Sequence, residues 1–259
     1  MKALYYWKAL ARGVILESIR RKDLWVVGIL GFIIIIASSA IGFFGSQGLE
    51  SFVKDLSTNV VGLFSTILAV VTTSRLMPDE VKNRTLYPLI ARPISRFDLI
   101  MGKFLGAVAV SWIAFLLLSG LTAIALLMFK VSFEPILAQY VLCKMMGIVV
   151  VCAVSLMFSL IMTTSAAITM SFVTLVGSGM IVQALTMAST TASPGQVILF
   201  QIVNGILPQV QLFDLGARAA NQNWGTVPLW VVGFLFAYMV AYSAAMIGIS
   251  WLKFRRLSV

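Results

Sequence analysis

Residues 145–213 read MMGIVVVCAVSLMFSLIMTTSAAITMSFVTLVGSGMIVQALTMASTTASPGQVILFQIVNGILPQVQLF and carry no charged side chain. We expect two membrane spans here, near Met145–Leu160 and Thr169–Ala188, joined by a tight turn at Thr163, Thr164 and Ser165. The apolar run Val197–Leu207 is too short to cross a bilayer and follows a Ser-Pro-Gly sequence. Residues 189–227 are therefore predicted to form an outer, re-entrant or interfacial segment.

On either side of this stretch, four more apolar segments have the length of about 20 residues that a helix needs to cross a hydrocarbon core of ~30 Å. They lie near Leu24–Phe44, Ser57–Met77, Gly102–Phe129 and Pro228–Leu252, and Lys130–Lys144 is predicted to be an outer connection. Six spans place fifteen Lys and Arg residues inside and four outside, as the positive-inside rule requires. We therefore predict an all-α, polytopic fold, one transmembrane domain over residues 1–259, with both ends in the cytoplasm.

The composition agrees with this class. Hydrophobic residues make up 60% of the 259 residues, charged residues 11%, and the mean hydropathy is +1.01. The net charge of +10 does not indicate nucleic-acid binding, because the basic residues flank apolar segments, where they set orientation and meet anionic lipid. The sequence has no histidine, which excludes His-dependent catalysis and His-based metal sites, and its two cysteines lie in apolar surroundings.

The N-terminal residues 1–23 are predicted to form an interfacial helix rather than a cleaved signal peptide, since no apolar run or cleavage motif precedes the first span. At 100° per residue an apolar face contains Leu4, Trp7, Leu10, Ala11, Val14 and Ser18. We expect this face to lie among lipid headgroups at the cytoplasmic surface. The alternative is a solvated basic tail.

Residues 75–103, RLMPDEVKNRTLYPLIARPISRFDLIMGK, form the most charged stretch. Pro78-Asp79-Glu80 is typical of a helix start, with acidic residues near the positive end of the dipole. Ser95 and Asp98 fit a capping box that opens the third span. The stretch predicts either a short rigid element that transmits force from a cytoplasmic partner or an ordinary positively charged loop.

Three motifs in this region resemble the signature of ABC-2-type transporter permeases, the membrane subunits of ATP-binding-cassette exporters. They are Glu80-x-x-x-Arg-Thr-Leu-x-x-Leu89, Ala91-Arg-Pro-Ile-Ser-Arg96 and Gly102-Lys-Phe-Leu-Gly106. The resemblance implies a prokaryotic cytoplasmic-membrane protein in which two permease copies, or a permease and a paralogue, pair around a translocation route. No Gly-x-x-x-x-Gly-Lys-Ser/Thr phosphate loop occurs in the sequence, so MgATP would be bound by a separate ATPase subunit.

The resemblance also implies roles for individual residues, none of them catalytic, cofactor-binding or metal-binding. The coupling element that docks on the ATPase would contain Glu80, Arg84, Thr85, Leu86, Leu89, Arg92, Pro93, Ser95 and Arg96, with a second contact at Thr164. Candidates for the translocation pathway are Asn59, Thr66, Thr73, Ser178 and Gln183, although small polar residues in a span also serve helix packing or bond to their own backbone.

Other function classes fit the sequence less well. An intramembrane enzyme or an ion-coupled secondary transporter or channel needs ionisable groups within the spans, and the predicted spans have essentially none at their centres. Gly177 and Gly179 allow a broken helix, which leaves the ion-coupled class open. A membrane anchor or mechanotransmission subunit of a cytoplasmic complex would need the same docking element and also stays open.

Overall fold

The computed structural model describes residues 2–22, 25, 29, 33, 49–82, 95–128, 134–189, 194–220 and 225–256. These residues form a set of helices without any described strand, which confirms the all-α class for this part of the chain. The helices are α1 (Lys2–Arg20), α3 (Leu49–Lys82), α5 (Arg96–Met128), α6 (Pro135–Ser159), α7 (Thr164–Ala188), α8 (Pro194–Ile206), the 3₁₀ helix η1 (Val210–Phe213), α9 (Gly216–Ala220) and α10 (Leu229–Arg256).

Five of these helices, α3, α5, α6, α7 and α10, are long and apolar enough to cross a membrane. The segments Gly195–Ile206 and Val210–Ala219 are bent by 64° relative to each other and would make a sixth crossing if they form one broken span. The first predicted span, near Leu24–Phe44, lies largely outside the described residues. The described helices therefore show a multi-pass membrane protein with five or six candidate spans.

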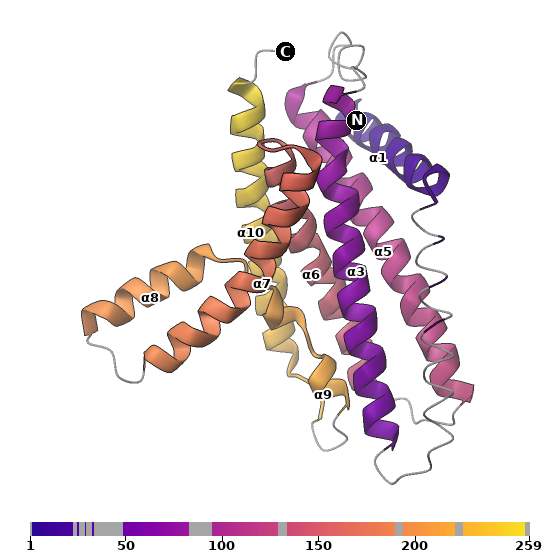
Figure 1. Cartoon of the computed structure of the whole chain (residues 1–259), viewed down its shortest axis with the longest axis vertical. Coiled ribbons are helices and arrows are strands. Elements are labelled where there is room, and N and C mark those ends of the chain that lie inside the picture. Colours follow the sequence, from indigo (N-terminus) through magenta and orange to yellow (C-terminus); the bar gives the residue numbers. More distant parts are fainter. Residues whose placement is uncertain are drawn as a thin grey trace.

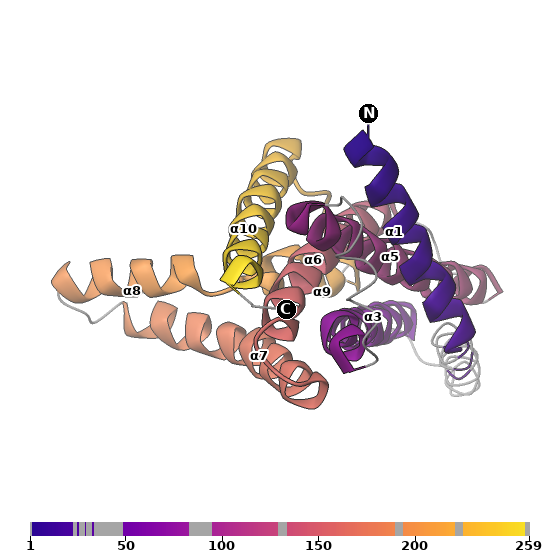
Figure 2. The same cartoon turned by 90° about the horizontal axis from the view of Figure 1, so that it is seen from above.

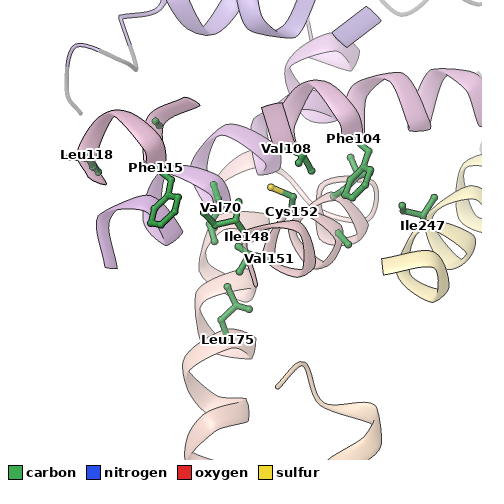
Figure 3. Packing of buried hydrophobic residues seen from close by; sticks show 14 of the residues in the cluster. Val70, Phe104, Val108, Phe115, Leu118, Ile148, Val151, Cys152, Leu175 and Ile247 are labelled. Atoms are coloured by element: carbon green, nitrogen blue, oxygen red, sulfur yellow. The ribbon is translucent and has the colours of Figure 1, made fainter. Parts of the chain in front are cut away.

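Helix α6 lies at the centre of the bundle, between α3, α5 and α10 (Figure 2). Of its apolar window, 67% is buried inside the protein, against 22% for α7 and α10. Figure 3 shows how Ile148, Val151 and Cys152 of α6 face Val70 of α3 and Val108 of α5 in the main apolar cluster. Of the five candidate spans α6 has the highest mean hydropathy, 2.4, and its one charged side chain, Lys144, is paired with Asp214. A helix that is apolar on nearly all sides can be buried all round, which suits the central place.

Helix α1 packs across the beginning of α5 (Figure 1). A Cβ atom on Gly102 would lie 2.7 Å from Leu10 Cβ, and one on Gly106 would lie 2.7 Å from Val14 Cβ, so both glycines allow close helix contact. The expectation that Leu10 and Val14 face lipid headgroups was therefore wrong, because α5 covers them. Leu4, on the same predicted face, is 71% exposed, so an interfacial position of α1 as a whole stays a prediction.

Two predicted boundaries were also wrong. Lys144 does not end an outer connection, because α6 begins at Pro135 and Lys144 lies inside the helix, where its ammonium group pairs with Asp214. Pro78 does not start a helix but lies inside α3, which continues to Lys82. The proline costs the helix one backbone hydrogen bond, and the buried side chains of Leu76 and Met77 beside it hold the turn in the bundle.

The tight turn predicted between the fourth and fifth spans is confirmed, since α6 ends at Ser159 and α7 begins at Thr164. After this turn α7 descends and then extends away from the bundle together with α8, which returns beside it (Figure 1). The chain next passes through η1 and α9, which pack against α6 and α3. A re-entrant path of residues 189–227 remains a prediction.

Candidate functional site

One end of the bundle gathers charged and polar side chains from α3 and α5, from α1 and the residue after it, and from the start of α7. It is the end at which α1 and the last turn of α10 lie (Figure 1). We call these residues the Asp79 cluster. Its members are Trp7, Arg21, Asp79, Glu80, Ser95, Arg96, Asp98, Lys103 and Thr164.

Asp79 links three helices through its two carboxylate oxygens. Arg21 Nη1, just after α1, donates to Asp79 Oδ2 at 2.9 Å, and Thr164 Oγ1, at the start of α7, donates to Asp79 Oδ1 at 3.4 Å. Arg21 also pairs with Glu17 at 2.8 Å. Asp79 therefore connects the end of α3 to the residue after α1 and to the start of α7.

Glu80, next to Asp79, forms an ion pair with Lys103 of α5. Both side chains are largely buried, with exposed fractions of 15% for Glu80 and 7% for Lys103. Removing one partner of such a pair leaves an uncompensated charge in the protein, which costs about 3–5 kcal/mol. The pair thus fixes the end of α3 against the beginning of α5.

The predicted N-cap Ser95 at the start of α5 is confirmed, with Asp98 bonded to its hydroxyl group. The Asp98 backbone N–H donates to Ser95 Oγ at 3.0 Å, and Ser95 Oγ donates to Asp98 Oδ2 at 2.6 Å. Trp7 Nε1 of α1 donates to the other carboxylate oxygen of Asp98 at 2.7 Å. The cap therefore holds α1 as well as the first turn of α5.

Arg96 connects the start of α5 to the end of α10. Its Nη1 donates to the carbonyl oxygens of Phe254 and Arg255 at 3.0 and 3.1 Å, and its guanidinium lies 5.8 Å from the centre of the Phe254 ring. A cation at this place satisfies carbonyl groups that have no partner within the helix and opposes the negative end of its dipole.

The cluster brings together residues that the sequence assigned to two separate contacts, Glu80, Ser95 and Arg96 on one side and Thr164 on the other. The remaining predicted coupling residues, Arg84, Thr85, Leu86, Leu89, Arg92 and Pro93, lie outside the described residues. The described ends of that stretch, Lys82 and Ser95, both belong to this end of the bundle. The arrangement holds ion pairs and caps, and it is suited to passing motion between helices.

The five pathway candidates are not gathered around one cavity. Asn59, Thr66 and Thr73 follow each other at seven-residue intervals along α3, from an exposed through a half-buried to a fully buried position. Ser178 is buried, with its hydroxyl 2.9 Å from Pro208 O, whereas Gln183 is exposed on the part of α7 that leaves the bundle. Thr66 donates to Gly62 O at 2.7 Å, which is the local backbone bonding that a hydroxyl in a span often makes.

Sequence reasoning missed a cavity of about 80 Å³ between α3, α5 and α6, lined in part by Ser57, Thr58, Ser119, Thr122 and Tyr140. It also missed three buried lysines, each paired with a carboxylate of another element: Lys54 with Glu134, Lys103 with Glu80, and Lys144 with Asp214. A signal existed in Glu134-Pro135, because proline favours the first turn of a helix and thus places Lys144 within that helix. Within the described residues, no group of three acidic or cysteine side chains could hold a metal ion.

The sequence model of the ABC-2 family transporter proteins matches residues 18–183, well over half of the chain. The match includes Asp79, Glu80, Lys103 and Thr164, and it ends before α8. No curated protein matches the chain. With its multiple apolar helices and this match, the chain belongs to the ABC-2 family of membrane transporter proteins.

Proposed function

We propose that this chain is the permease subunit of an ATP-binding-cassette exporter in a prokaryotic cytoplasmic membrane, and that a separate ATPase subunit binds MgATP and docks at the Asp79 cluster. The observation that carries the proposal is the position of Asp79, which joins the end of α3 to α1 and to the start of α7. Glu80 and Lys103 extend the same contact to α5. A push on the stretch between α3 and α5 would therefore move four helices together.

The proposed topology has six spans, cytoplasmic termini and a second permease copy or paralogue beside the first. Its support is the charge distribution of the sequence and the common location of α1 and the end of α10 (Figure 1). Ser95, just before α5, and Thr226, shortly before α10, are both exposed. These two helices begin at opposite ends of the bundle (Figure 1). A cysteine at Ser95 should react from the cytoplasmic side and one at Thr226 from outside; labelling of both from one side would refute this topology.

The first test is co-purification of the chain from its native source in mild detergent. An ATPase subunit with a phosphate-binding loop and vanadate-sensitive hydrolysis is the expected partner. Transport driven by an ion gradient without any such partner would instead support the ion-coupled class, for which the Lys144–Asp214 pair supplies ionisable groups within the helical bundle.

The docking role is tested by Asp79→Asn and Glu80→Gln in the reconstituted complex. Each removes a charge-assisted contact between helices, so transport per ATP hydrolysed should fall by at least about fivefold while membrane insertion is retained. Asp55→Asn, at the other end of α3, is the matched control and should keep normal coupling. In the part of the chain that the structure describes, Asp55 bonds to Thr58 and Asn59 of its own helix. Normal coupling in both test variants would refute the docking assignment.

A further inference from the structure

The residues after α8 return into the bundle near its middle and run on to α9, toward the end opposite to the Asp79 cluster (Figure 1). We call Leu207–Ala219 the return segment. Its η1 part contacts α6 and α7, and its α9 part contacts α3 and α6. The return segment thus lies among three helices that come from widely separated parts of the sequence.

The helices receive the return segment through small residues. Phe213 is fully buried against Gly147 of α6, where an added Cβ would lie 2.9 Å from Phe213 Cβ. Gln211 lies against Gly179 of α7, where an added Cβ would lie 1.9 Å from Gln211 Nε2. A side chain at Gly147 would therefore collide with the buried Phe213 of the segment in its present position, whereas one at Gly179 would displace the end of the exposed Gln211 side chain.

An ion pair completes this contact. Lys144 of α6 is buried, and its Nζ donates to Asp214 Oδ2 at 2.7 Å, while the other carboxylate oxygen accepts the Gly216 backbone N–H at 3.0 Å. The Lys144 Nζ lies 3.0 Å from the position that a Cβ on Gly62 of α3 would occupy. Asp214 is thus held by its own turn and by a lysine of the central helix.

The two partners differ in what happens if they separate. Lys144 belongs to a long helix and stays in apolar surroundings, whereas the Asp214 side chain is 41% exposed and belongs to a short segment. Removal of the carboxylate would leave a buried ammonium group without this partner, which is strongly unfavourable. The ion pair therefore opposes withdrawal of the return segment from between α3, α6 and α7.

We propose that the return segment is a gate in the outer half of the bundle and that the Lys144–Asp214 ion pair is its latch. The outer location of the segment and its role as a gate rest on the proposed transport function. The latch itself is a property of the chain alone: separation of Asp214 from Lys144 accompanies release of the segment.

The test measures how often the return segment leaves its site. Ala219 is buried at the end of the segment, so in a cysteine-free full-length chain an Ala219→Cys residue should react slowly with a membrane-impermeant maleimide in nanodiscs. Lys144→Met and Asp214→Asn should each raise the labelling rate at least about tenfold, because each breaks a buried ion pair. The reversed pair, Lys144→Asp with Asp214→Lys, should return the rate toward that of the parent.

Lys54→Met is the matched control. Lys54 is also fully buried and paired with a carboxylate, Glu134 Oε1 at 2.9 Å, but this pair joins α3 to the start of α6 and does not include the return segment. Its labelling rate should stay within about twofold of the parent, because the Lys54–Glu134 pair does not bind the return segment.

Two results would overturn the latch: unchanged labelling in folded Lys144→Met and Asp214→Asn variants, or an equal increase in Lys54→Met. Elution of a variant as a monodisperse species in detergent shows that it is folded. If a single variant misfolds, the reversed pair is still informative, because labelling that stays fast in the reversed pair also counts against the latch. The measurement needs no ATPase. If the labelling pattern is as expected but the chain supports no ATP-driven transport, the latch is supported and the proposed function is refuted.

Discussion

Replacing Gly106 with alanine is expected to push α1 away from α5. The new Cβ would lie 2.7 Å from Val14 Cβ and 3.1 Å from Ala11 Cα. Carbon atoms prefer separations of about 3.5–4.0 Å, so the two helices must move apart by about 1 Å. Because Ala11 Cα is a backbone atom, a rotamer change of Val14 cannot relieve the contact.

Overpacking of this kind costs about 1–3 kcal/mol. For a chain of this size the loss corresponds to a decrease of about 2–12 °C in the midpoint of thermal unfolding. Gly120→Ala, on the same helix, is the matched control, since an added Cβ there meets no atom within 4 Å. Both variants gain the helix-forming preference of alanine, about 0.5–1 kcal/mol, so their difference isolates the contact with α1.

The assay is thermal unfolding of the purified full-length chain in detergent, followed by circular dichroism. Gly106→Ala should unfold at a lower temperature than both the parent chain and Gly120→Ala. Equal midpoints for the two variants would show that α1 does not pack on α5 through Gly106, and the placement of Arg21 beside Asp79 would lose its support.

Two further substitutions test the cap of α5 and the contact between α3 and α6. Ser95→Ala removes the side chain that caps α5 and should lower the free energy of unfolding by about 0.5–2 kcal/mol, measured by thermal unfolding in detergent. Ser95→Thr should retain most of the stability. A Ser95→Ala protein as stable as the parent would contradict the cap. Tyr140→Phe removes the bond from the Tyr140 hydroxyl to Thr58 O, 2.7 Å long and buried, and should cost about 0.5–1.5 kcal/mol. Tyr5→Phe, on the exposed surface of α1, is its control, and equal effects of the two changes would argue against the buried bond.

The general class of the fold could be predicted because long apolar runs in a sequence have few alternatives to membrane helices. The turn before Thr164 and the cap at Ser95 could be predicted for a similar reason, since both depend on neighbours within a few residues. The contact between Asp79 and Thr164 could not, because 85 positions separate them and only the packing of α3 against α7 brings them together.

Prediction failed where a charge was taken as the mark of a loop. Lys144 was placed outside the helices on this basis, yet Asp214, 70 positions later, provides a carboxylate that allows the ammonium to stay inside. Lys54 repeats the case with Glu134. A sequence shows that a lysine is costly in an apolar helix, but the partner that offsets the cost is visible only in the folded chain.

By itself the sequence determined that this chain is a multi-pass helical membrane protein with a strongly charged stretch between residues 75 and 103, because hydropathy, length and local capping are properties of neighbouring residues. Only the tertiary structure decided that α6 is central, that α1 lies on α5, and that three lysines are buried in ion pairs. These outcomes depend on which helix faces meet and how closely glycines let them approach, and those distances arise between residues that are far apart in the chain.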